Sequence, residues 1–190
     1  MSNVAEKFLT YVKIDTQSDR YSLTTPSTKK QLKLSKLLVK ELKSLGLEDI
    51  SLSEYGYVMA SLPGNIPDYK GPAIGFIAHM DTSPDYTAEN VKPKLVENYD
   101  GKEIQLDEAS KITLSPKEFP KLQNYKGKTL ITTDGSTLLG ADDKAGVAEI
   151  MAAIEHLAKN PEIPHGPIRV AFTPDEEVGR EADHFDVEAF

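Results

Sequence analysis

The feature that most constrains the fold is an alternation of short apolar runs with longer helical patterns. Residues 73–78 form an uninterrupted apolar run, which is typical of a strand buried on both faces of a sheet. Residues 129–132 and 168–172 also read as strands, and a helix pattern at 143–158 lies between them. Because strands that alternate with helices favour parallel pairing, the sequence predicts the α/β class. We expect a mainly parallel sheet with helices on both faces.

Two more helical patterns occupy the start of the chain. The first covers residues 4–12, where apolar side chains recur every four positions. The second follows Ser27 or Thr28, either of which can cap a helix N-terminus, and it ends before Gly46, which suits the position after a helix. Its apolar stripe consists of Leu34, Leu38, Leu42 and Leu45.

Residues 84–127 have a different character from the rest of the chain. They are rich in proline, lysine, asparagine and acidic residues, with brief β-like stretches near Leu95, Ile104 and Ile112. We expect an excursion over the surface, which either lines a substrate entrance or is simply solvated.

Composition excludes several classes of partner and site. Of 190 residues, 30 are acidic and 22 are basic, so the formal net charge is −8, which disfavours nucleic acid and anionic membranes. The absence of cysteine excludes disulfides and thiolate chemistry. The N-terminal residues do not read as a signal peptide, and no apolar run approaches the roughly 20 residues that span a bilayer. We therefore expect a soluble, cytoplasmic protein.

Reactive side chains gather in three loops, each of which follows a predicted strand. His79 and Asp81 follow the first strand, Asp142 lies beyond the second, and Glu176 and Glu177 follow the third. In open α/β sheets, functional groups collect beyond the carboxyl ends of the strands. These side chains are therefore expected to meet at one edge of the sheet.

Carboxylates gathered in this way need a positive charge, because like charges raise one another's pKa. Lys144 and Arg180 are the only basic residues close to these loops in sequence, which favours a metal ion. A histidine among carboxylates suits zinc, manganese or cobalt, whereas oxygen ligands alone suit magnesium or calcium.

The spacing of these residues suggests separate roles. His79 and Asp81 point to the same side of an extended backbone, so Asp81 can orient the imidazole. Asp142 at a helix start has two free oxygens that can bridge two cations. The neighbours Glu176 and Glu177 diverge in direction, so one can bind metal while the other acts as a general base.

Three sequence blocks resemble the signatures of co-catalytic dinuclear zinc peptidases. They are IAHMDT at 77–82, GADDKAG at 140–146 and FTPDEEVG at 172–179. This superfamily includes aminoacylases, carboxypeptidase G and the tripeptide aminopeptidases of the peptidase T family. The last of these is the most similar, through the stretches at 119–122 and 130–142, and the resemblance covers essentially the whole chain.

The resemblance implies a zinc-peptidase catalytic domain with two zinc ions per complete site, for which cobalt or manganese could substitute. It implies that His79 binds one zinc, Glu177 binds the other and Asp142 bridges both. Glu176 would take a proton from the bridging water and deliver it to the leaving amine, while Asp81 would orient His79. The peptide bond that follows Asp142 is typically cis in this family.

The resemblance also implies that the domain is incomplete at its C-terminus. The family supplies a further aspartate, a distant histidine, and a lid and dimerisation domain between them, and residues 1–190 match none of these. Asp183, His184 and Asp186 do not correspond to the missing ligands. Residues 1–190 are thus expected to be the N-terminal part of the catalytic domain, inactive or very weak alone. The family dimerises through the lid, so we expect a homodimeric parent enzyme and a monomeric fragment.

The leading hypothesis is a metalloaminopeptidase that acts on tripeptides. A related dipeptidase, carboxypeptidase or deacylase stays open, because the residues that read the substrate would lie largely outside this chain. A truncated, non-catalytic module that binds metal or peptide also stays open. A structural metal site is disfavoured, because structural zinc favours closed sites of cysteine and histidine.

Overall fold

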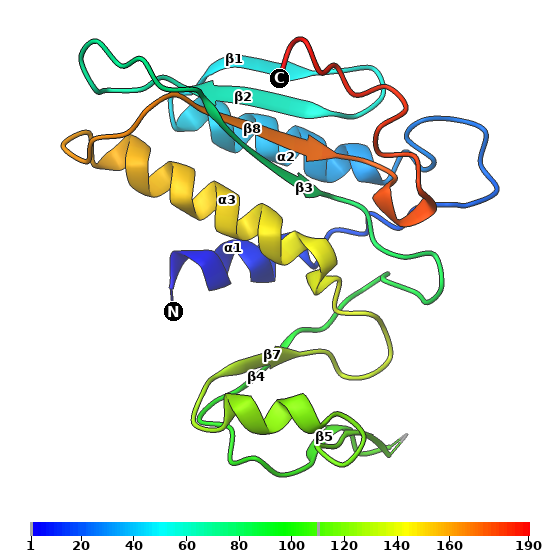
Figure 1. Cartoon of the computed structure of the whole chain (residues 1–190). Helices are drawn as coiled ribbons and strands as arrows, with labels where there is room; N and C mark the ends of the chain where they lie inside the picture. Colours follow the sequence, from blue (N-terminus) through cyan, green and yellow to red (C-terminus); the bar gives the residue numbers. More distant parts are fainter. Residues whose placement is uncertain (1, 110) are drawn as a thin grey trace.

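The computed structural model describes residues 2–109 and 111–190 (Figure 1). A sheet with three helices forms the main body, and a small lobe of short strands extends from it. None of the helices in the described residues is long and apolar enough to cross a membrane. In chain order the elements are α1 (Asn3–Tyr11), α2 (Gln31–Ser44), β1 (Glu48–Leu52), β2 (Val58–Leu62), β3 (Ile74–His79), β4 (Lys94–Val96), β5 (Ile104–Asp107), β6 (Ile112–Leu114), η1 (Pro120–Tyr125), β7 (Leu130–Thr132), α3 (Ala141–Lys159), β8 (Ile168–Thr173) and η2 (Glu176–Val178).

The main sheet is mixed rather than mainly parallel, so that part of the fold prediction is wrong. Its four strands have the order β1-β2-β8-β3, and only β3 and β8 run parallel. The pairs β1–β2 and β2–β8 are antiparallel. Strand β7, which we expected in this sheet, pairs with β4 in a separate two-stranded sheet. The short connection between β1 and β2 makes an antiparallel hairpin, because a parallel pair needs a longer crossover.

The helices lie on one side of the main sheet instead of on both. Figure 1 shows α1, α2 and α3 below the sheet and the C-terminal segment above it. On that second face, the Phe185 ring meets Tyr57 with a centroid separation of 6.0 Å, and Phe190 packs against Gly75. A short aromatic segment therefore covers a face where we expected a helix.

The core fills the space between the helices and the sheet. Its fully buried members include Leu34, Leu38, Leu42, Val58, Ala60, Val147, Met151, Val170 and Phe172. The leucine stripe predicted for the second helix thus faces the core, and the predicted stripe of the third helix contributes Val147 and Met151.

The start of α2 differs from the expected cap. The helix begins at Gln31, and the preceding Lys30 makes no side-chain capping bond. The hydroxyl of Ser27 donates to Asp175, and that of Thr28 donates to the carbonyl of Gln17, so both are engaged elsewhere. The helix end is as predicted, with Gly46 just after it at a positive φ of 77°.

Strand β3 forms an edge of the sheet, and its first part is exposed. Ile74, Phe76 and Ile77 are 56%, 46% and 52% exposed, so the predicted burial on both faces is wrong for these residues. The end of the strand, Ala78 and His79, is buried. No strand of the described residues pairs with the outer edge of β3.

The polar excursion at 84–127 makes up most of the small lobe. Its predicted β-like stretches are confirmed as β4, β5 and β6, and β5 pairs with β6. The 3₁₀ helix η1 was not expected from the sequence. The lobe lies apart from the main sheet in Figure 1 and joins α3 through residues 133–140.

Candidate active site

The parallel pairing of β3 with β8 brings two of the three predicted loops together. His79 at the end of β3 lies opposite Thr173 at the end of β8. The chain beyond β8 turns into η2, where the backbone N–H of Glu176 donates to one oxygen of the Asp81 carboxylate at 3.0 Å. The N–H of Glu177 donates to the other oxygen at 3.2 Å. One buried carboxylate therefore joins the loop after β3 to the loop after β8.

His79 lies at the centre of the site, with acidic groups at both ring nitrogens. Its Nδ1 is 3.1 Å from the backbone carbonyl of Asp81 and 3.3 Å from the Asp81 carboxylate. Its Nε2 is 3.0 Å from the carboxylate of Asp142 and 3.6 Å from that of Glu176. Nδ1 thus faces the acceptors of Asp81, and Nε2 is the ring nitrogen directed towards the carboxylates of Asp142 and Glu176.

The site is closed on one side and open on the other. Asp81 is fully buried and His79 is 7% exposed. The Asp142 side chain, in contrast, is 88% exposed, and that of Glu176 is 43% exposed. The imidazole thus forms the floor of the site, and the carboxylates near its Nε2 face solvent.

Asp142 lies at a helix start, as expected, but the strand that precedes it, β7, is outside the main sheet. This aspartate belongs to the first turn of α3, where Asp142 and Asp143 have non-helical backbone angles and are joined by a cis peptide bond, as the resemblance implied. The Asp143 carboxylate accepts the N–H of Gly146 at 3.2 Å, as a helix cap does. The helix α3, rather than a neighbouring strand of the sheet, therefore carries Asp142 to His79.

The charges around His79 favour a cation at this position. Burial alone would lower the pKa of His79, but the hydrogen bonds and charges of Asp81, Asp142 and Glu176 outweigh it and raise the pKa to about 9. Burial raises the pKa of Glu177, His79 opposes this shift, and repulsion from neighbouring carboxylates adds to it. Both shifts have the sign expected for a surplus of negative charge.

The two basic residues near the site are used elsewhere. Lys144 is 1% exposed, and its ammonium donates to the carbonyl of Ile14 at 2.7 Å; burial lowers its pKa to about 8. The Arg180 guanidinium donates to the carbonyls of Ser22 and Thr24. Among the described residues, neither forms an ion pair with the carboxylates that face His79.

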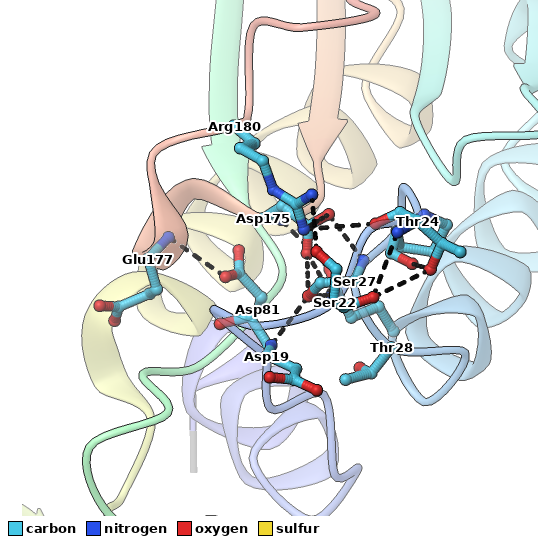
Figure 2. Close-up of polar contacts among 12 residues, drawn as sticks. Asp19, Ser22, Thr24, Ser27, Thr28, Asp81, Asp175, Glu177 and Arg180 are labelled. Atoms are coloured by element: carbon cyan, nitrogen blue, oxygen red, sulfur yellow. Dashed lines mark hydrogen bonds and ion pairs between the residues drawn. The ribbon is translucent and has the colours of Figure 1, made fainter.

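The chemistry of these donors suits a transition metal. An imidazole nitrogen beside carboxylates is the ligand chemistry of zinc, cobalt and manganese. Across residues 2–109 and 111–190, however, no three histidine, aspartate or glutamate side chains are grouped closely enough to hold a metal ion alone. The Glu177 carboxylate points away from Asp81 (Figure 2).

No sequence pattern pointed to Asp175, which is fully buried. Its carboxylate accepts hydrogen bonds from the backbone and hydroxyl of Ser27 and from the side chain of Gln31. These partners lie more than 140 positions away along the chain, so no local pattern could have revealed them.

Comparisons with known proteins give the same family as the three sequence blocks. The model of peptidase family M20/M25/M40 matches residues 125–186. Over 190 residues the chain is 61% identical to peptidase T of Halothermothrix orenii and 63% identical to peptidase T of Clostridium acetobutylicum. Each alignment covers the whole chain and 46% of the relative, so the chain spans about half the length of these curated relatives.

Solved structures show a similar arrangement of elements. The aminopeptidase PepT of Bacillus cereus and a tripeptidase of Staphylococcus aureus each match with a TM-score of 0.67 and 25% identity, over 99% of this chain and 40% of theirs. An aminoacylhistidine dipeptidase of Vibrio alginolyticus shares the fold, with a TM-score of 0.61 at 19% identity, over 97% of this chain and 30% of that protein. The chain is therefore a homologue of peptidase T, in the M20 family of peptidases, over the N-terminal ~46% of those enzymes.

Proposed function

We propose that residues 1–190 are the N-terminal part of the catalytic domain of a metal-dependent aminopeptidase that releases the N-terminal residue from tripeptides. The observation that carries this proposal is the meeting of His79, Asp142 and Glu176, in a chain about 60% identical to peptidase T throughout. The rest of the catalytic domain, with a lid and dimerisation domain, would come from the half of the relatives that this chain does not match.

Two zinc ions would complete the site, with cobalt or manganese as substitutes. His79 would hold one ion through Nε2, Glu177 would hold the other, and Asp142 would contact both. The ions would supply Lewis acidity, which lowers the pKa of a bound water and polarises the scissile carbonyl. Further ligands from the remainder of the enzyme would complete both metal sites.

Glu176 would act as the general base. Its carboxylate lies 3.6 Å from His79 Nε2 and is partly open to solvent, so it can reach both a water molecule and a peptide at the same place. In the proposed reaction Glu176 takes the proton of the attacking water and then gives it to the leaving amine.

Asp81 holds the backbone of the two glutamates and the ring of His79 in position. Its carboxylate accepts the backbone N–H groups of both Glu176 and Glu177, which fixes the backbone that carries the two side chains. It also lies within 3.3 Å of His79 Nδ1, so it can hold the proton there and leave Nε2 for the metal.

The test uses the polypeptide as its source organism makes it, loaded with zinc or cobalt. Glu176→Gln should retain the metal and lose turnover of free tripeptides by about 10²–10⁴-fold, the usual contribution of a general base. Glu188→Gln, at an exposed position on the C-terminal segment, is the matched control and should keep full activity. A Glu176→Gln enzyme that retained most of its turnover would contradict the assignment of the base.

The substrate separates the alternatives. An aminopeptidase needs a free α-amine, so N-acetylated tripeptides should resist cleavage. Their hydrolysis at a comparable rate would instead indicate a carboxypeptidase or deacylase of the same family.

A non-catalytic metal- or peptide-binding module is the second candidate. Metal binding without turnover of any peptide would support it.

A further inference from the structure

Asp175 connects the loop that carries the two glutamates to a segment near the N-terminus. Its buried carboxylate accepts the N–H of Ser27 at 2.7 Å, the Ser27 hydroxyl, and the side-chain amide of Gln31 at 2.7 Å. The oxygen of the same Gln31 amide accepts the backbone N–H of Asp175 at 3.2 Å. Both the backbone and the side chain of Asp175 are therefore held by the start of α2.

The backbone at Asp175 makes the turn that directs the next two residues. Its φ of 61° is in the left-handed region, which a non-glycine residue adopts only when its surroundings hold it there. Directly after this turn, the N–H groups of Glu176 and Glu177 point at Asp81. Because Asp81 in turn contacts His79, one chain of contacts runs from α2 to the imidazole.

Arg180 strengthens the same connection from the other end of η2. Figure 2 shows its guanidinium between Asp175 and the loop at residues 18–28. It donates to the carbonyls of Ser22 and Thr24 and lies 3.8 Å from the Asp175 carboxylate, while its backbone N–H donates to the Asp175 carbonyl. The loop after β8 is thus held at both ends by the N-terminal segment.

We propose that Asp175 is a positioning residue, which fixes the backbone of Glu176 and Glu177 against Asp81 by tying it to Ser27 and Gln31. The residue touches no reacting group itself. Its effect on catalysis rests on the proposed function, whereas its effect on the loop does not. A carboxylate is required at this position because all its close partners are donors. An amide group would turn one of its two acceptors into a donor facing them.

Hydrogen exchange of single amides, measured by NMR on the metal-free 190-residue chain, tests the connection. The quantity compared is the ratio of the exchange rates of the Glu176 and Glu177 amides to the exchange rate of the Val170 amide, in the centre of β8. In Asp175→Asn this ratio should rise at least about tenfold. A role in overall stability alone would accelerate Val170, in the core strand, at least as much as the two loop amides, so this ratio would not rise. An unchanged ratio would overturn the proposal.

Two further variants keep the test decisive. Ser27→Ala removes one hydroxyl and should raise the same ratio by a smaller factor, about threefold, so it serves where Asp175→Asn fails to fold. Glu41→Gln weakens a different polar contact of α2, with Tyr11 and Lys7 of α1, and should leave the ratio unchanged. A rise in Glu41→Gln equal to that in Ser27→Ala would also overturn the proposal.

The catalytic consequence is measured separately, on the polypeptide as its source organism makes it. Ser27→Ala should lower kcat for tripeptides about fivefold and leave KM within about twofold, because the variant loosens only the backbone of Glu176 and Glu177. A changed KM with an unchanged kcat would contradict the positioning role. Complete absence of tripeptide hydrolysis in the unmodified enzyme would overturn the proposed function instead, and the exchange ratio would still report on the loop.

Discussion

Replacing Asp81 by alanine removes an acceptor on which two loops depend, and the structure allows the cost to be worked out. The side chain is fully buried and accepts two backbone N–H groups, at 3.0 and 3.2 Å, besides its contact with His79. Each donor left without a partner costs about 1–3 kcal/mol, so the two amides and the imidazole together account for about 3–9 kcal/mol. Some of this is recovered, because a buried charge no longer needs to be desolvated and water can reach the partly buried amides. We therefore expect Asp81→Ala to lower the free energy of unfolding by about 2–4 kcal/mol.

The assay is urea denaturation of the metal-free chain followed by circular dichroism, because the protein contains no tryptophan. Asp81→Asn keeps one acceptor oxygen and should lose about half as much stability as Asp81→Ala. Asp100→Ala is the control, since Asp100 also accepts a backbone N–H, that of Lys102 at 2.9 Å, but lies exposed in the small lobe. If Asp81→Ala moved the unfolding midpoint no further than Asp100→Ala does, the reasoning about buried acceptors would be refuted.

Two other predictions concern stability against pH and solubility. Hydrogen bonds from Lys159, Lys7 and Asn3 lower the pKa of Glu155 to about 2, so its contribution is present above the ordinary carboxyl pKa of 4.5 and is lost as the pH falls towards 2. The melting temperature of the natural chain should therefore exceed that of Glu155→Gln by up to about 2–4 °C at pH 6. This difference should shrink between pH 4.5 and pH 3, and a constant difference would contradict the lowered pKa of Glu155. Phe76→Lys places a charge on the exposed edge strand β3, and charged edge strands resist pairing between molecules. The variant should therefore raise the protein concentration at which light scattering first detects aggregation. An unchanged threshold would show that aggregation starts elsewhere.

The helices and strands of the main body were largely predictable because their signals are local. The leucine stripe of α2 and the left-handed glycine that follows it were both readable from neighbouring residues. The same is true of β3 and β8, whose apolar runs lie within two residues of the observed strands. The start of α2 was misjudged, because Ser27 has the right chemistry for a cap but forms its bond with Asp175 instead.

The site was only partly predictable. The expectation that His79 and Asp142 would meet agrees with their distance of 3.0 Å, and Asp142 lies at a helix start as expected. The preceding strand β7, however, is outside the main sheet in which we expected it. The roles of the individual ligands stay predictions. The part played by Asp175 was invisible, because its partners come from the far end of the chain.

The sequence by itself determined which segments bury apolar surface, which residues carry the acidic and imidazole groups, and which family the chain resembles. These properties depend on residue type and on spacing over a few positions. Only the tertiary structure decided the direction of each strand, the exposure of the first part of β3, and the placement of all three helices on one face of the main sheet. Parallel and antiparallel ladders use the same backbone N–H and C=O groups, so the choice between them rests on packing between distant segments, which no local pattern records.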